Sequence, residues 1–304
     1  MTTKTDFLTS LTSGSGRYKR FTESPLRYAG GKSLAVGQIV ALLPDNIAKV
    51  MSPFVGGGSV EVAIAKHLGL PVQAFDIFDL LVNFWQTALN KPNELADELS
   101  KLSADKQTFD SVKATLKRHF KNEQSVDDAI TLAALYFFNH NTSYGPGFLG
   151  WPSSVYMNDR KWQAMIAKIR QFAVPNLSVN HGSFVDTIPN AEDAFIYADP
   201  PYFLEGDSKM FRGIYPQRNF PIHHNGFDHA LLRDQLLAHK GGFLLSYNDC
   251  STIREWYADC EIFEPVWQYT MGQGETRIGA NRSAAGENHV KKSHELLIRK
   301  LPNG

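Results

Sequence analysis

A glycine-rich turn between two short apolar segments constrains the fold of this chain more than any other feature. KVMSPF (49–54) predicts a buried strand that runs into Gly56-Gly57-Gly58, and SVEVAIAKHLG (59–69) predicts a helix that ends at Gly69. PVQAFD (71–76) predicts the next strand. A strand, a turn, a helix and a second strand form one βαβ unit, which implies a parallel sheet. The sequence therefore predicts an α/β protein.

Apolar segments elsewhere extend this sheet and enclose a long helical region. Further strands are expected at 177–182, 194–199, 241–249 and 294–300, and further helices at 33–43 and 228–240. Helical spacing also fills 92–138 and 159–172, with a turn-rich, aromatic stretch at 139–154 between them. We expect one sheet domain built from 23–85 and 176–304, a helical insertion at 86–175, and a flexible N-terminus at 1–22.

The composition suits a protein with a substantial core. The chain has 304 residues, of which 43% are hydrophobic and 20% charged, and its formal net charge is zero. It contains no run of about 18 apolar residues and no secretory signal, so no membrane partner is expected. Cys250 and Cys260 are expected to be reduced thiols, and no residue grouping predicts a metal site.

The glycine turn and the acid that follows it favour a nucleotide-type ligand. Glycines before a helix N-terminus let a ligand approach the backbone, although a tight structural turn would need them equally. The dinucleotide pattern G-x-G-x-x-G is not met, because Glu61 stands at its third glycine. Asp76 ends the next strand about twenty residues after the turn, where an acid can accept both ribose hydroxyls of an adenosine ligand.

The strongest chemical signal is FIYADPPYF (195–203), an apolar strand that ends in Asp199-Pro200-Pro201-Tyr202. The prolines supply no backbone donors, so a carboxylate and the carbonyls of Asp199 and Pro200 remain as acceptors. Such acceptors can bind both hydrogens of an exocyclic amine and direct its lone pair toward an electrophile. Tyr202 offers an aromatic face to a base that has left the duplex. Asp199, Pro200, Pro201 and Tyr202 are therefore the predicted catalytic residues.

With these motifs the sequence resembles the Dam-type (D12 class) DNA adenine-N6 methyltransferases over most of its length. LRYAGGKS (26–33) resembles the family's opening motif, PFVGGGSV (53–60) its cofactor loop, and Asp199 to Tyr202 its catalytic motif. FLLSYND followed by REWY (243–257) and KSHELLI (292–298) resemble its late strands. Ser52 stands where the family often has an acid before Pro-Phe.

The resemblance implies a Rossmann-like methyltransferase fold with a mixed, mostly parallel seven-stranded sheet and an inserted target-recognition domain. It also implies S-adenosyl-L-methionine as the cofactor, double-stranded DNA as the partner, and a cytoplasmic, bacterial or phage-encoded enzyme. The implied cofactor-binding residues are Tyr28, Lys32, Pro53, Phe54, Gly56, Gly58, Asp76, Ile77, Phe184 and Asp199.

DNA contacts are expected from the insertion and from the loop after the catalytic motif. Clusters of basic residues can create a positive face on a neutral protein, and the aromatic turn lies where the family has its DNA-contacting hairpin. The candidates for phosphate contacts are Arg118, Lys121, Arg160 and Lys161, those for base-edge contacts are Asn141, Ser143 and Tyr144, and those for a lid are Arg212 and Arg218.

Two other functions are compatible with the sequence. Cytosine N4 methylation uses the same amine geometry, and the Asp at the first position of the motif only favours adenine. A DNA-binding regulator could retain the fold without catalysis, although the intact Asp-Pro-Pro-Tyr, the glycine turn and Asp76 argue against it. The 139–154 turn does not closely resemble the part of the family that reads GATC, so no target sequence is predicted.

Overall fold

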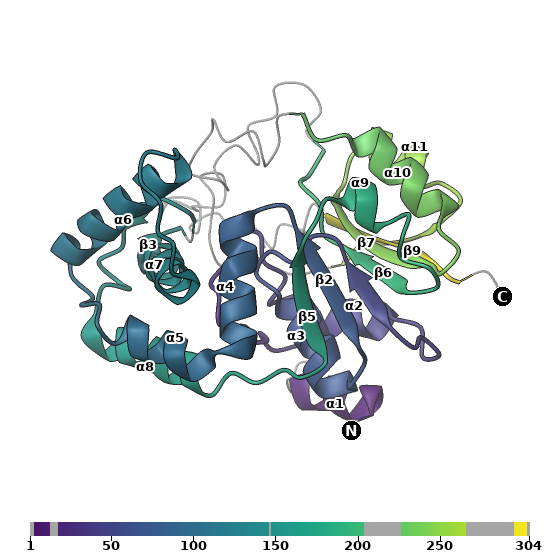
Figure 1. The fold of residues 1–304 in the computed structure, drawn as a ribbon. Coiled ribbons are helices and arrows are strands. Elements are labelled where there is room, and N and C mark those ends of the chain that lie inside the picture. Colours follow the sequence, from purple (N-terminus) through teal and green to yellow (C-terminus); the bar gives the residue numbers. More distant parts are fainter. Residues whose placement is uncertain (1–2, 13–17, 146, 204–225, 266–294, 303–304) are drawn as a thin grey trace, which may run out of the picture.

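Seven strands form one sheet within the residues that the computed structural model describes, which are 3–12, 18–145, 147–203, 226–265 and 295–302 (Figure 1). The strand order is β5-β2-β1-β6-β7-β9-β8. The strands are β1 (Val50–Ser52), β2 (Val72–Asp76), β5 (Leu177–His181), β6 (Phe195–Ala198), β7 (Phe243–Asn248), β8 (Glu261–Phe263) and β9 (Glu295–Lys300). The first five pair in parallel, and β9 runs antiparallel to β7 and β8. The predicted mixed, mostly parallel sheet is confirmed.

Helices cover both faces of this sheet, which explains why its central strands are continuously apolar. In β6, Phe195 and Tyr197 belong to one buried core, whereas Ile196 and Ala198 belong to another. The helices of the first core are α2 (Val36–Leu42), α3 (Ser59–Ala63) and α4 (Asp79–Asn90). Helix α3 continues directly into the π-helical turn η1 (Ile64–Leu68). Those of the second are α9 (Phe184–Thr187), α10 (His229–Ala238) and α11 (Ser251–Trp256).

The order of the strands fixes where a ligand can bind. From β1 the chain moves outward to β2 and β5, and it then returns to place β6 on the other side of β1. The carboxyl ends of β1 and β6 therefore lie side by side where the winding reverses. Ligands of open α/β sheets bind in the crevice at such a reversal. The glycine turn follows β1, and Asp199 follows β6.

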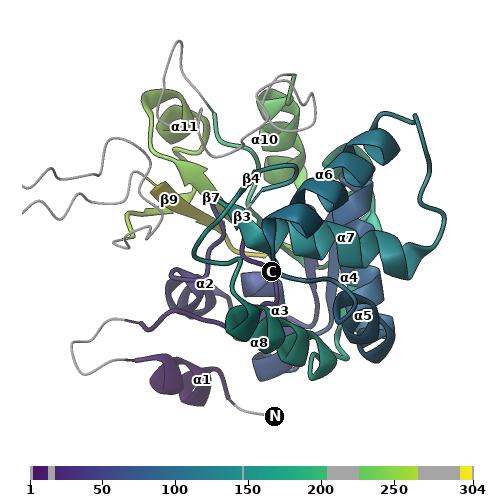
Figure 2. The same ribbon diagram turned by 90° about the vertical axis from the view of Figure 1, so that its left-hand side faces the viewer.

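The predicted insertion is helical and lies to one side of the sheet (Figures 1 and 2). Its elements are α5 (Pro92–Leu99), α6 (Lys106–Phe120), α7 (Ala129–Thr142), the hairpin β3 (Ser143–Tyr144) with β4 (Trp151–Pro152), and α8 (Asp159–Arg170). Its core is continuous with that of the sheet, because Phe84 of α4 stacks on Phe137 of α7 at 5.3 Å between ring centroids. The boundaries at 86 and 175 and the role in target recognition stay predictions.

Two local expectations were wrong. Residues within the predicted flexible N-terminus form helix α1 (Lys4–Leu11), which lies beside α2 (Figure 2). Thr3 and Asp6 form a reciprocal cap, and Phe7 is buried against the ring of His67 at 4.6 Å. REWY (254–257) also does not form a strand, since Arg254 to Trp256 belong to α11. The edge strand β8 was not predicted.

Two further observations concern the cysteines and the helices. Among the described residues, Cys250 and Cys260 are not joined by a disulfide bond. No helix in the described parts of the chain is long and apolar enough to cross a membrane.

Candidate active site

The glycine turn after β1 is shaped by two aromatic side chains. Gly58 has a φ of 62°, and a Cβ atom built on it would lie 2.4 Å from the Trp85 ring. A Cβ atom on Gly57 would lie 2.5 Å from Cβ of Tyr28. The indole nitrogen of Trp85 donates to the Gly56 carbonyl at 3.0 Å. The three glycines are therefore required by packing and backbone conformation, which leaves the turn as a close-fitting wall of the site.

Asp76 connects this turn to the end of β2. Its carboxylate accepts from the backbone N–H of Gly56 at 3.1 Å and from that of Phe78 at 3.0 Å. Burial raises the pKa of Asp76, and these backbone donors act in the opposite direction. Each carboxylate oxygen has two lone pairs, so further hydroxyl donors can still bind. Asp76 thus braces the glycine turn and presents acceptors beside it.

Lys32 forms an ion pair with Asp199, although the two residues are far apart in the sequence. The ammonium lies 2.7 Å from Oδ1 and 2.9 Å from Oδ2 of Asp199, and it donates to the Gly30 carbonyl at 3.1 Å. Burial raises the pKa of Asp199, whereas the positive charge of Lys32 lowers it. The nearby ammonium therefore favours the ionised carboxylate in a buried position. The sequence had suggested a cofactor contact for Lys32, not this pairing.

A third acid, Glu61, faces the same space and was missed as a site residue. Its side chain lies on the first turn of α3, and the residue is 3% exposed. The Ser52 hydroxyl donates to its Oε1 at 2.7 Å. Burial raises the pKa of Glu61 to about 8. One sequence signal could have identified Glu61, because it stands at the third glycine position of the G-x-G-x-x-G pattern, shortly after the glycine turn. This position had served only as evidence against a dinucleotide site.

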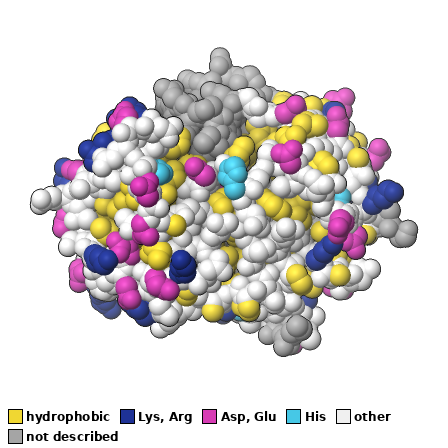
Figure 3. Space-filling view, viewed as in Figure 1, with side chains coloured by type: hydrophobic (Ala, Val, Ile, Leu, Met, Phe, Trp, Pro, Cys, Tyr) yellow, Lys and Arg dark blue, Asp and Glu magenta, His cyan; other side chains and the backbone are white. Residues whose placement is uncertain are grey.

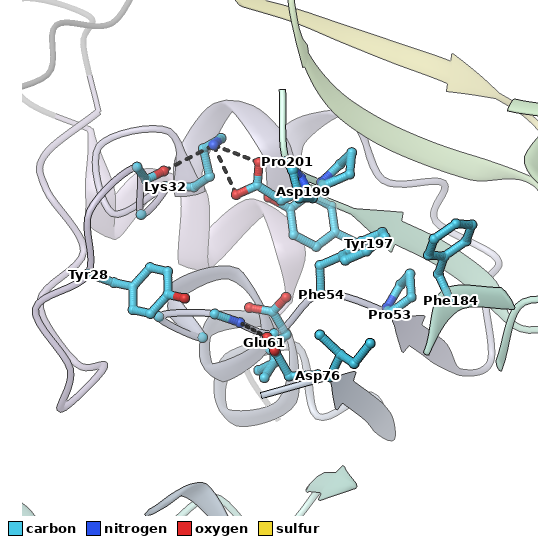
Figure 4. A pocket seen from close by; sticks show the side chains of 18 of the residues that line it. Tyr28, Lys32, Pro53, Phe54, Glu61, Asp76, Phe184, Tyr197, Asp199 and Pro201 are labelled. Carbon is cyan, nitrogen blue, oxygen red and sulfur yellow. Dashed lines mark hydrogen bonds and ion pairs between the residues drawn. The ribbon is translucent and has the colours of Figure 1, made fainter. Parts of the chain in front are cut away.

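These side chains surround one pocket with a cavity volume of about 340 Å³ (Figure 4). Every predicted catalytic and cofactor-binding residue lines it: Tyr28, Lys32, Pro53, Phe54, Gly56, Gly58, Asp76, Ile77, Phe184, Asp199, Pro200, Pro201 and Tyr202. The pocket also includes Glu61 and Tyr197. Figure 4 shows carboxylates from β2, α3 and the end of β6 around it. Residues from five separate segments therefore meet at the reversal of the sheet, and their individual roles stay predictions.

The predicted DNA-contacting residues divide into exposed and buried groups. Arg118, Lys121, Arg160 and Lys161 are exposed. Tyr144 is 68% exposed and lies opposite Trp151, which is 72% exposed, in the hairpin β3-β4. On the face in Figure 3, basic and acidic side chains are interspersed over the helical segment. This face therefore carries no uniformly positive patch.

Asn141 and Ser143 do not fit the predicted role in base contacts. Both are fully buried, since α7 continues through Thr142 and places them against the N-terminal loop. Oδ1 of Asn141 accepts from the backbone of Arg27 at 2.9 Å, and Oγ of Ser143 donates to the Asn139 carbonyl at 2.6 Å. We therefore withdraw these two as base contacts. Arg212 and Arg218 lie outside the described residues.

Comparisons with known proteins agree with this geometry. The profile of the family described as D12 class N6 adenine-specific DNA methyltransferase matches residues 28–271. The Type II methyltransferase M.MjaIII of Methanocaldococcus jannaschii is 28% identical over 197 residues, covering 58% of this chain and 68% of the relative. The Type II methyltransferase M1.LlaDCHI of Lactococcus lactis subsp. cremoris is 23% identical over 251 residues, which cover 78% of this chain and 84% of the relative. The modification methylase StsI of Streptococcus sanguinis is 22% identical over 92% of this chain, which spans only 43% of the relative's length.

Proposed function

The chain belongs to the D12 class of N6 adenine-specific DNA methyltransferases, and from this premise we propose that it methylates an adenine turned out of duplex DNA into the pocket beside Asp199. The methyl group would pass directly from S-adenosylmethionine to N6. One observation carries the proposal: Asp199-Pro200-Pro201-Tyr202 and the glycine turn line the same pocket at the reversal of the sheet. A strand-end acid that only caps a turn would not need this arrangement.

The residues around the glycine turn fit the cofactor. When bound, S-adenosylmethionine supplies an electrophilic methyl group. The Asp76 carboxylate has acceptors left for ribose hydroxyls after its two backbone bonds. Ile77 is 52% exposed, and Phe54 and Phe184 lie 5.8 Å apart, so these side chains offer apolar walls to an adenine ring. A cavity of about 340 Å³ falls within the usual range of small-molecule sites.

The catalytic motif would orient the amine of the target base. The Asp199 carboxylate and the Pro200 carbonyl would each accept one amine hydrogen, which directs the nitrogen lone pair toward the methyl group. Lys32 would hold this carboxylate ionised and in place at 2.7 Å. Tyr202 stacks against Tyr247 at 6.1 Å between centroids, so its ring is held in position to contact the base. Orientation of this kind contributes on the order of 7–11 kcal/mol in favourable cases, and base stacking about 1–3 kcal/mol.

The helical segment and its hairpin are the proposed DNA-binding part. Tyr144 and Trp151 lie opposite each other in the hairpin and are both exposed, and exposed aromatic rings are suited to stacking on bases. Lys113 lies over Trp151 at 4.9 Å and donates to the Gly150 carbonyl at 2.8 Å, which holds the hairpin beside α6. Arg118, Lys121, Arg160 and Lys161 would contact phosphates. Because the substrate is DNA, we place the enzyme in the cytoplasm of a bacterium or of a phage-infected cell.

The experiment is to incubate the protein with unmethylated duplex DNA and S-adenosylmethionine, digest the DNA, and identify the modified nucleoside. We expect N6-methyladenosine as the deoxynucleoside. Detection of N4-methylcytosine instead would support the cytosine alternative. Calorimetry with the cofactor tests the regulator alternative, since a non-catalytic regulator would bind DNA but would not bind the cofactor even at millimolar concentration.

A further inference from the structure

Glu61 is a buried carboxylate that forms no ion pair with the part of the chain that the structure describes. Its residue is 3% exposed, and its one side-chain partner is the Ser52 hydroxyl at 2.7 Å. Among the described residues, no Lys, Arg or His nitrogen lies within 4.0 Å of its oxygens. A buried ionised carboxylate is strongly unfavourable unless a positive charge or several hydrogen-bond donors compensate it. Glu61 is therefore either neutral or prepared for a cation that arrives with a ligand.

The charged groups around Glu61 are already engaged with each other. The nearest ones acting on it electrostatically are Asp199 and Lys32, which form their own ion pair at 2.7 Å. Lys32 also donates to the Gly30 carbonyl. The negative charge of Asp199 opposes ionisation of Glu61, and burial raises the pKa of Glu61 to about 8. Lys32 lowers the pKa of Glu61 slightly, but within the described residues no cation of the protein forms an ion pair with Glu61.

Glu61 also lies at a defined end of the pocket. It lines the cavity together with the glycine turn and the catalytic motif, and Figure 4 shows its carboxylate directed into the space between Tyr28 and Phe54. The Ser52 hydroxyl that donates to Glu61 lies at the end of β1, which pairs with β6, and Asp199 follows β6, so Glu61 lies toward the reacting end. Asp76, the proposed ribose acceptor, is held separately by Gly56 and Phe78. A cationic ligand group near Glu61 would thus belong to the part of the cofactor beyond the ribose.

S-adenosylmethionine has two cationic groups beyond its ribose, the sulfonium and the α-ammonium. Only the ammonium has N–H donors that a carboxylate can accept. We propose that Glu61 binds the α-ammonium group of the cofactor's amino-acid part and that Ser52 orients the carboxylate for it. This inference rests on the proposed function, because it assumes that S-adenosylmethionine occupies this pocket. It adds a specific binding role to a residue that no cofactor or catalytic prediction had included.

The test compares two ligands that differ in the amino-acid part. S-adenosylhomocysteine carries the α-ammonium, whereas 5′-methylthioadenosine shares the adenosine thioether but lacks the amino-acid part. Both are titrated calorimetrically into wild type and Glu61→Gln. A lost charge-assisted hydrogen bond predicts an affinity for S-adenosylhomocysteine about ten- to a hundredfold weaker. The affinity for 5′-methylthioadenosine should change by less than about twofold, because this ligand has no ammonium group.

Two further variants separate a binding role from general damage. Ser52→Ala removes the donor to Glu61 and should weaken S-adenosylhomocysteine selectively, but less than Glu61→Gln does. Glu295→Gln is the matched control, since Glu295 is 4% exposed in β9 and lies outside the pocket lining. It should leave both affinities unchanged. Melting temperatures of all variants report whether each one folds.

Proton release gives a readout that a purely structural acid would not produce. At pH 7 Glu61 is mostly protonated, because its pKa is about 8. Binding an ammonium would ionise it, so wild type should show net proton release on binding S-adenosylhomocysteine, measured from titrations in buffers of different ionisation enthalpy. Glu61→Gln should release none. The inference is overturned if Glu61→Gln weakens both ligands equally, or neither. If wild type itself binds neither ligand, the proposed function fails first.

Discussion

Gly58→Ala tests whether the glycine turn is fixed by packing against α4. The new Cβ atom would lie 2.4 and 2.6 Å from ring atoms of Trp85, well inside van der Waals contact. Trp85 cannot retreat, because it is completely buried and its indole N–H is bonded to the Gly56 carbonyl. Left-handed backbone strain costs roughly 1–2 kcal/mol, and overpacking adds about 1–3 kcal/mol. The free energy of unfolding should therefore fall by about 2–5 kcal/mol.

Gly145→Ala is the matched control for this change. Gly145 has a φ of 63°, almost the same as Gly58, but no atom lies within 4 Å of its added Cβ. This variant should lose only the backbone contribution, roughly 1–2 kcal/mol. Urea denaturation, monitored by circular dichroism, measures the free energy of unfolding of both variants. Since movement of Trp85 would disturb Gly56, Gly58→Ala should also weaken S-adenosylhomocysteine. Equal losses of stability in the two variants would refute the steric argument.

Four further substitutions test the site and the DNA-binding hairpin. Asp76→Asn should weaken S-adenosylhomocysteine by about tenfold or more in calorimetry, because a charged acceptor for ribose is lost; an unchanged affinity would remove Asp76 from the cofactor site. Lys32→Met removes the charge that lowers the pKa of Asp199, so the acidic limb of the pH–rate profile should move to higher pH. An unmoved limb would show that Lys32 does not control this ionisation. Tyr144→Ala and Trp151→Ala should each weaken DNA binding by about 1–3 kcal/mol in fluorescence anisotropy, and no loss in either would exclude the hairpin.

The parallel sheet could be predicted because each of its signals is local. The β1–α3–β2 unit shows its apolar segments and its glycine turn within 49–76, and β6 is a short apolar strand ending in Asp199. Helix α1 was missed for the opposite reason. Its capping pair, Thr3 and Asp6, lies among other polar residues, and a single buried ring, Phe7, docks it. A helix of 8 residues is stabilised by such tertiary packing more than by its own sequence.

The members of the site could be predicted, but their partners could not. Asp76 and Asp199 both follow predicted strands, so the rule for parallel sheets places them at one edge. The pairing of Lys32 with Asp199 joins residues 167 positions apart, and it depends on the strand order. Burial explains why two of the predicted DNA contacts were wrong. Asn141 and Ser143 looked like exposed polar residues of a turn, but the end of α7 encloses them.

The measurement that tests the central claim most directly is the transfer of radiolabelled methyl from S-adenosylmethionine to duplex DNA by wild type and by Asp199→Ala. Asp199 is the proposed acceptor for the target amine, so the variant should lose transfer by about a hundredfold or more. Wild type should yield labelled N6-methyladenine. Full transfer by Asp199→Ala would contradict the assignment of this pocket as the catalytic site.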